Sequence, residues 1–376
     1  MFETYSYLFL QQYWWVIGSL LGGLLVFLMF VQGGQTLFNT IAKNSEEKTM
    51  LVNSMGRKWE FTFTTLVTFG GAMFAAFPKF YSTSFGGAYW VWIAILFCFI
   101  IQAVSYEFRS KPKNFLGAKT YDAFLYINGS LGVFLVGAAV ATFFTGSNFK
   151  INDYNQVEWQ MATRGLEAVF NIQNVALGLA VFSLARILGA QYFINNIDDE
   201  NIYIRSRKQV MYNSIIFLVF FLTFVGFLLT NAGYAYNPLT KQVTLESFKY
   251  LHNFLQMPIV LGLFMVGVVF VLAGIFVTLF KTSKKGIWFS GIGTVLTVFS
   301  LFLVSGLNHT SFYPSTFDIQ SSLTIENSSS SQYTLTAMSY VSLFVPVVLL
   351  YIYLAWKALD KSKIDKHEMK DNEHIY

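Results

Sequence analysis

Charged residues are scarce in this chain of 376 residues, and their scarcity excludes a soluble globular fold. Only 12% of the residues are charged, whereas 55% are hydrophobic and 19% are aromatic. A soluble domain is typically about 25% charged, because charge keeps a folded surface in water. The mean hydropathy of +0.50 agrees with this reading. The composition indicates a polytopic membrane protein and excludes a disordered chain or one that wraps nucleic acid.

Cysteine and histidine are also rare, which restricts the metal chemistry. The single cysteine, Cys98, lies within an apolar run, so neither an intrachain disulfide nor a cysteine-based metal cluster can form. Two of the four histidines, His367 and His374, follow the last apolar stretch, and His252 and His309 lie at the ends of two others. No histidine falls at the middle of a stretch. We therefore expect no haem ligated by two histidines of this chain.

Long stretches without Asp, Glu, Lys or Arg are the main feature of the sequence. A helix needs about 20 mostly apolar residues to cross the hydrocarbon core. A slightly shorter stretch can still span it, because the long side chains of flanking basic residues reach out to the headgroups. There are nine stretches of 18 residues or more: 4–42, 61–78, 80–106, 123–149, 168–185, 209–240, 250–280, 286–317 and 327–356. Such solid runs predict helices. The predicted fold class is an all-α integral membrane protein with nine transmembrane helices.

The basic residues indicate the orientation of these helices. Nine crossings define two sides, and of the 25 lysines and arginines 20 fall on one side and 5 on the other. The richer side is predicted to be cytoplasmic, which places the N-terminus outside and the C-terminus in the cytoplasm. No basic segment or cleavage site precedes the first stretch, so we interpret it as a retained span. The mixed-charge tail, 359–376, is predicted to be a solvated end.

Glu60 and Glu107 are the acidic residues of most interest near the spans. A charged side chain at the centre of a membrane helix costs roughly 2.5–3.5 kcal/mol, so each such residue is a candidate site. Both glutamates fall at the predicted cytoplasmic ends of consecutive helices, where they can line one inward-facing proton entry. The alternative is that each pairs at the interface with a neighbouring Arg57, Lys58 or Arg109. The residues alone favour that alternative.

Several segments resemble subunit II of the cytochrome bd quinol oxidases, including their cyanide-insensitive branch. They are Trp59 with Glu60, followed by 70–81, 106–111, 253–262 and 314–335, and they occur in order over nearly the whole chain. The resemblance implies nine helices arranged as two four-helix bundles plus one peripheral helix. We place the bundles at 1–150 and 151–310, and assign the outer loop, the ninth helix and the tail to 311–376.

The resemblance also implies a function. Members of this family are haem-free subunits of a heterodimeric terminal oxidase of aerobic respiration, which oxidises quinol and reduces oxygen to water with cytoplasmic protons. Haems b and d belong to a partner, subunit I, and this chain contributes no redox centre of its own. A structural quinone, lipids and a small single-span subunit are further expected partners, in the cell inner membrane.

Individual residues acquire roles from the same resemblance. Glu60 and Glu107 match the acidic positions of the family and become proton-route candidates, and Trp59 becomes the candidate contact for a quinone or lipid. Better-known members have Asp-Gly-x-Asp where this chain has Gln32 and Gln35 around two glycines, and Gln102 replaces a basic residue. Glutamine orients a water chain but does not exchange a proton at ordinary pH. Loss of an acid and a base together is consistent with a neutral helix contact.

Two other functions are weighed against this one. A secondary transporter also has many spans, but it should show helices interrupted by Gly or Pro at matching places in two halves, together with a central charge. The sequence lacks both features. A purely structural assembly subunit, without a proton role, remains open and is separated from the first reading by experiment.

Overall fold

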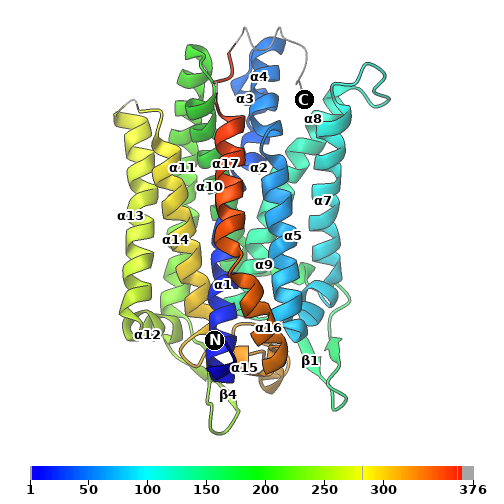
Figure 1. Cartoon of the computed structure of the whole chain (residues 1–376), viewed down its shortest axis with the longest axis vertical. Coiled ribbons are helices and arrows are strands. Elements are labelled where there is room, and N and C mark those ends of the chain that lie inside the picture. The colour runs from blue at the N-terminus through cyan, green and yellow to red at the C-terminus, as the bar shows by residue number, and fades with distance from the viewer. Residues whose placement is uncertain (1, 282, 362, 366–376) are drawn as a thin grey trace.

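The computed structural model describes residues 2–281, 283–361 and 363–365, and helices dominate it (Figure 1). Within these ranges, seven helical segments are long and apolar enough to cross a membrane, and one bent pair adds an eighth. The predicted class, an all-α protein with many membrane spans, is confirmed at this level. His367 and His374 lie outside the described residues.

The described residues of the first half of the chain form nine α-helices. They are α1 (Tyr7–Leu28), α2 (Phe30–Gln35), α3 (Phe38–Ile41), α4 (Ser45–Gly56), α5 (Trp59–Ala76), α6 (Pro78–Tyr81), α7 (Tyr89–Phe108), α8 (Ala118–Ile127) and α9 (Val133–Thr145). The short helical turns are η1 (Phe2–Thr4), η2 (Ser82–Gly86) and η3 (Asn128–Gly132), of which the last two are π-helical.

In the second half, the part of the chain that the structure describes adds eight α-helices and four short strands. The helices are α10 (Ile172–Asn196), α11 (Glu200–Thr230), α12 (Lys249–Gln256), α13 (Pro258–Phe280), α14 (Gly286–Gly306), α15 (Ile325–Ser328), α16 (Gln332–Ser342) and α17 (Val345–Leu359), with 3₁₀ turns η4 (Leu166–Phe170) and η5 (Ile319–Ser321). Two antiparallel hairpins pair β1 (Phe149–Ile151) with β2 (Val157–Trp159), and β3 (Gly233–Tyr236) with β4 (Val243–Glu246).

Several predicted spans are interrupted rather than straight. The first stretch divides at Met29, where α1 ends and α2 begins. The fourth passes from α8 to α9 through the π-turn η3. The ninth is the pair α16 and α17, bent by 41°; Pro346 lies in the first turn of α17, where its missing N–H costs nothing. Charge-free length therefore located helical regions without revealing the breaks within them.

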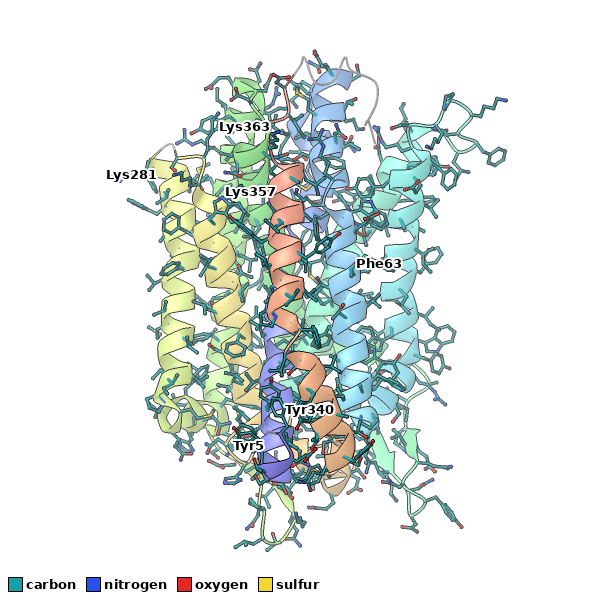
Figure 2. All side chains as sticks on the ribbon, in the orientation of Figure 1. Tyr5, Phe63, Lys281, Tyr340, Lys357 and Lys363 are labelled. Atoms are coloured by element: carbon teal, nitrogen blue, oxygen red, sulfur yellow. The ribbon has the colours of Figure 1, made fainter. Side chains whose placement is uncertain are left out.

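The two ends of the bundle differ in structure. One end, called here the basic end, carries α3, α4 and the turn between α13 and α14, and the opposite end, the hairpin end, carries the hairpins, α12 and α15 (Figure 1). Figure 2 places Lys281 and Lys363 near the basic end and Tyr5 and Tyr340 near the hairpin end. The structure thus collects basic residues at the end that the sequence assigns to the cytoplasm.

Helix α10 is the central element of the packing. Its side chains are buried on nearly every face, and it contacts α2 and α9 as well as α11. The approach to α2 depends on glycine, because a Cβ added at Gly33 would overlap the backbone of Ala185. Small residues allow membrane helices to pack this closely. Since α10 joins both halves, the division into bundles at 1–150 and 151–310 stays a prediction.

The prediction of a solvated end is wrong at Asp360 and Ile364, which contact the rest of the bundle. Ile364 is fully buried, and its backbone N–H donates to the carbonyl of Asn196 at 3.0 Å, in a bridge that also includes Ile197. Asp360 forms an ion pair with Lys58 at 2.8 Å. The partners come from distant parts of the chain, which local composition cannot reveal.

Candidate functional site

Four polar side chains from α2 and α7 meet inside the bundle, near the basic end. Gln32, Gln35, Gln102 and Tyr106 are each no more than 2% exposed. The Gln32 side-chain amide donates to Oε1 of Gln102 at 3.3 Å, and that of Gln35 donates to the Tyr106 hydroxyl at 3.0 Å. The structure therefore brings both glutamines predicted as site residues into contact with one neighbouring helix.

Helical spacing explains why these side chains converge. Gln32 and Gln35 are three residues apart on α2, and Gln102 and Tyr106 are four apart on α7, so each pair lies on one helix face. Gly33, between the glutamines, packs against α10. The glutamines consequently point toward α7 while the glycine faces the other neighbour.

Asn128 completes the group, and the sequence analysis missed it. It is fully buried at the first position of η3, and neither atom of its amide has a hydrogen-bond partner. The next residue, Gly129, packs on α2, since a Cβ there would overlap the carbonyl of Gln32. π-turns often occur at functional sites. The adjacent asparagine and glycine inside an otherwise apolar stretch were the available signal.

The group is rich in polar atoms without protein partners. We call Gln32, Gln35, Gln102, Tyr106 and Asn128 the glutamine cluster. The unpartnered atoms are Oε1 of Gln32, Oε1 of Gln35, Nε2 of Gln102, and Oδ1 and Nδ2 of Asn128. Buried polar groups are nearly always hydrogen-bonded, to protein or to ordered water. Donors and acceptors gathered in one place are the surroundings that buried water requires.

Trp59 lies directly beside this cluster. Its ring stacks on Tyr106 with ring centres 5.9 Å apart and an interplanar angle of 14°. The side chain is 8% exposed, and its indole N–H is buried without an acceptor. The predicted contact residue for a quinone or lipid therefore has one free donor, next to the only hydroxyl of the cluster.

Glu60 and Glu107 are exposed, unlike the buried side chains of the cluster. Neither is in an ion pair with a basic residue in the part of the chain described. Lys58 and Arg109, two of the partners that the alternative reading required, pair with other carboxylates. Both glutamates immediately follow in sequence a residue of the stacked pair, Trp59 or Tyr106, which places them at the exposed edge of the same region.

A buried ion pair lies near the start of α5. Lys58 is fully buried, and Nζ lies 2.8 Å from Oδ1 of Asp360, which ends α17. The Tyr192 hydroxyl and the Asn196 amide donate to the same carboxylate at 3.2 and 3.3 Å. The ammonium also lies 4.8 Å from the ring centre of Trp356. These contacts join α5, α10 and α17 at the basic end.

Three further ion pairs lie at the basic end. Asp122 on α8 accepts from Lys48 at 2.6 Å and from Arg109 at 2.8 Å. Glu47 on α4 pairs with Arg205 on α11 at 2.6 Å. Together they connect α4 to α8 and α11, and the C-terminal end of α7 to α8.

Stability should depend on the charge of Glu47. Burial alone raises the pKa of Glu47, but Arg205 and the backbone N–H of Lys43 outweigh it and hold the pKa below the usual value. A carboxylate with a lowered folded-state pKa stabilises the fold above its unfolded pKa, about 4.3, and loses this as the pH falls through the folded value. We expect Glu47→Gln to lower the Tm at pH 7 by about 2–4 °C.

The pH dependence is the control for this prediction. The Tm difference between wild type and Glu47→Gln should shrink as the pH is lowered below about 4, because the wild-type carboxyl is then protonated. Glu46→Gln, at an exposed neighbour, should leave the Tm nearly unchanged. A difference that persists undiminished in acid would show that charge is not the cause.

The described histidines do not fit a haem site. His252 is 45% exposed at the hairpin end, and its Nδ1 lies 2.8 Å from Oε1 of Glu246. His309 is also exposed, in a left-handed backbone conformation with φ of 52°. Within the described ranges, no group of three or more His, Cys, Asp or Glu side chains could hold a metal ion.

Comparison with known proteins identifies the family of the chain. The family model described as cytochrome bd terminal oxidase subunit II matches residues 10–359. The structure is similar to that of the bd oxidase from Geobacillus thermodenitrificans, with a TM-score of 0.56 over 93% of this chain and 96% of the other. The sequences of that pair are 12% identical, so the likeness concerns the fold.

Curated relatives extend the same match over the whole chain. Cytochrome bd-I ubiquinol oxidase subunit 2 of Escherichia coli strain K12 is 28% identical, over 98% of this chain and 99% of its own length. The probable cytochrome oxidase subunit 2 of Haemophilus influenzae is 27% identical over 96% of this chain and 98% of its own length. The chain therefore belongs to the family of cytochrome bd terminal oxidase subunit II.

Proposed function

We propose that this chain, as subunit II of a bd-type quinol oxidase, supplies a proton route from the basic end through water held by the glutamine cluster. Membership of the family supports the oxidase assignment. The observation that carries the proton role is the set of unpartnered polar atoms on Gln32, Gln35, Gln102 and Asn128. An apolar interface between the same helices would need none of them.

The chemistry of the cluster suits water better than direct exchange. A neutral glutamine amide does not take up and release a proton at ordinary pH. Its oxygen and nitrogen instead fix the orientation of waters, along which a proton moves by successive hydrogen-bond exchange. The Tyr106 hydroxyl, which already accepts from Gln35, can both donate and accept in such a chain.

Glu60 and Glu107 serve as the collecting groups in this proposal. Both are exposed carboxyls, on α5 and α7, and neither is neutralised by an ion pair within the described residues. A free carboxylate at a positively charged end can capture protons from water and pass them to an adjacent hydrated region. The sequence neighbours Trp59 and Tyr106 link this surface to the cluster.

Trp59 is proposed to contact a bound quinone or lipid. Its unpartnered indole N–H supports this role, because a buried donor costs about 1–3 kcal/mol when it has no acceptor. A carbonyl or ester oxygen of a bound molecule would satisfy it. The stacking on Tyr106 fixes the direction in which the N–H points.

The finer membrane layout is also proposed. Helix α5 has 18 residues and runs alongside the long helices in Figure 1; adding it to the seven spans and the bent pair gives nine crossings. Helix α5 is not among the seven candidate spans, and its threonines and Glu60 make it less apolar than they are. We place the basic end in the cytoplasm, with the N-terminus outside and the C-terminus inside, because basic residues collect there.

The remaining chemistry is assigned to partners. Haems b and d are proposed to reside in a haem-bearing subunit I, since the described histidines here do not fit haem. A small single-span subunit and lipids complete the proposed complex. Purification of a tagged chain tests this: a haem-bearing multispan partner with a haem d absorption band should copurify, whereas a lone haem-free protein would contradict the assignment.

Conversion of the two collecting acids to glutamine tests the proton role. We expect Glu60→Gln and Glu107→Gln each to lower oxygen turnover of the purified complex about threefold, equivalent to less than 1 kcal/mol of barrier, because the two acids substitute for each other. The double variant should lose more. Oxygen consumption and proton uptake in reconstituted vesicles measure both effects.

Glu200→Gln is the matched control, since Glu200 is an exposed acid at the basic end on a different helix, α11. It should not change turnover. Normal turnover and normal proton uptake in all the variants would instead favour a purely structural subunit.

A further inference from the structure

Arg186 is a charged residue within a membrane-spanning helix. It is the fifteenth of the 25 residues of α10, so at a rise of 1.5 Å per residue its Cα lies roughly 15 Å from the helix end at Asn196. That end contacts the turn between α13 and α14 through Asn195 and the carbonyl of Lys284 at 2.9 Å. The arginine is therefore set well below the basic end, within the apolar part of the bundle.

The guanidinium of Arg186 has no anionic partner among the described residues. Its Nε is buried without an acceptor, and no carboxylate forms an ion pair with it. It lies 5.4 Å from the ring centre of Phe182, one turn away on the same helix. Tyr126, on α8, is the ionisable neighbour that interacts with it electrostatically. Neither aromatic group neutralises a full positive charge.

The residues around Arg186 show which face of α10 is accessible to an anion. Leu179, Phe182 and Arg186 are spaced by three and four and are all partly exposed, whereas most of α10 is buried. This stripe is the outward face of the helix. Next to it on α8, Tyr126 is 46% exposed and Ile127 is 38% exposed. The face is apolar apart from the guanidinium and the phenol, as a surface in contact with lipid should be.

We propose that Arg186, together with Tyr126, binds the phosphate of an anionic phospholipid in the leaflet at the basic end. The arginine fork donates two parallel hydrogen bonds to phosphate oxygens, and the phenol can donate a third. The long side chain reaches from its apolar position toward the headgroups. An intramembrane charge without a partner costs several kcal/mol, and a phosphate from the surrounding bilayer removes that cost without any further protein.

Lipid titration of the purified oxidase complex tests this site. The complex is delipidated in neutral detergent and titrated with phosphatidylglycerol or phosphatidylcholine, and bound lipid is counted by native mass spectrometry. We expect Arg186→Gln to weaken phosphatidylglycerol binding about tenfold, the loss expected for one charge-assisted contact. Arg186→Lys keeps the charge but lacks the planar guanidinium group. Its affinity for phosphatidylglycerol should lie between those of wild type and Arg186→Gln.

The control is Lys208→Gln, at an exposed lysine on α11, which should bind phosphatidylglycerol like wild type. Equal binding of the two lipids by wild type, or unchanged binding by Arg186→Gln, would overturn the proposal.

A photoreactive phosphatidylglycerol on the wild-type complex provides a second measurement that needs no variant. Labelling of peptides from α8 and α10 is expected. Labelling elsewhere only, or crosslinking of Arg186 to the carboxylate of another protein chain, would contradict a lipid site.

Discussion

Replacing Gln102 by leucine is expected to lower oxygen turnover of the assembled oxidase about tenfold, with the complex still formed. Leucine has a similar volume but no polar atom, so it removes the acceptor of the Gln32 amide and one anchor for the proposed water. A tenfold change corresponds to about 1.4 kcal/mol of barrier. Stopped-flow oxygen consumption and proton uptake, at matched amounts of assembled complex, measure it.

Gln191→Leu is a matched control for this substitution. Gln191 is also a buried glutamine in a membrane helix, with an unpartnered Oε1, and it donates to the Thr278 hydroxyl at 3.1 Å. It lies on α10, outside the glutamine cluster. Equal loss of turnover in Gln102→Leu and Gln191→Leu would attribute the effect to general destabilisation. Normal turnover in Gln102→Leu would remove the cluster from the proton route.

The glutamine cluster shows what replaces the acid and the base that better-known members of the family have. The sequence suggested that an acid on the first helix and a base on the third were lost together, leaving a neutral contact. The structure has a hydrogen bond between Gln32 and Gln102, long at 3.3 Å. An ion pair would satisfy both partners, whereas this amide pair leaves Oε1 of Gln32 and Nε2 of Gln102 free. Those free atoms are the basis of the proposal that the cluster holds water.

Much of the architecture could be predicted because few backbone conformations are stable in the hydrocarbon core of a membrane. Stretches without charge must be helical to satisfy their backbone, and the structure places a helix on each. The interruptions at Met29 and Asn128 could not be predicted, because neither residue breaks a helix by itself. They depend on packing against α10 and α2, at contacts such as Gly33 with Ala185 and Gly129 with Gln32.

Gln32, Gln35 and Gln102 were singled out because of the family resemblance, and the structure brings these residues of the first and third spans into contact. Their role in a proton route stays a prediction. Asn128 was overlooked because a single amide in an apolar stretch is usually a packing residue. The contact of Lys58 with Asp360 was missed because the two residues are far apart in sequence, and charged residues outside a span were read as solvated.

The ion pair of Lys58 with Asp360 supports the last prediction, on stability. Lys58→Met removes the cation beside the Asp360 carboxylate, which then keeps its hydrogen bonds from Tyr192 and Asn196. Breaking a fully buried pair costs about 3–5 kcal/mol; Asp360 remains 19% exposed, so we expect a cost of about 2–3 kcal/mol. The Tm of the complex should fall, and the chain after α17 should be cleaved faster in limited proteolysis.

Two further variants separate the ionic contact from lost packing. Lys284→Met breaks the pair with Asp198, whose side chains are 41% and 62% exposed, and such surface pairs contribute about 0–1 kcal/mol. Its effect should therefore be much smaller. Adding Asp360→Leu to Lys58→Met should recover part of the lost stability, because it removes the unpaired carboxylate. If Lys58→Met cost no more than Lys284→Met, the pair would not be what holds α17 against α5 and α10.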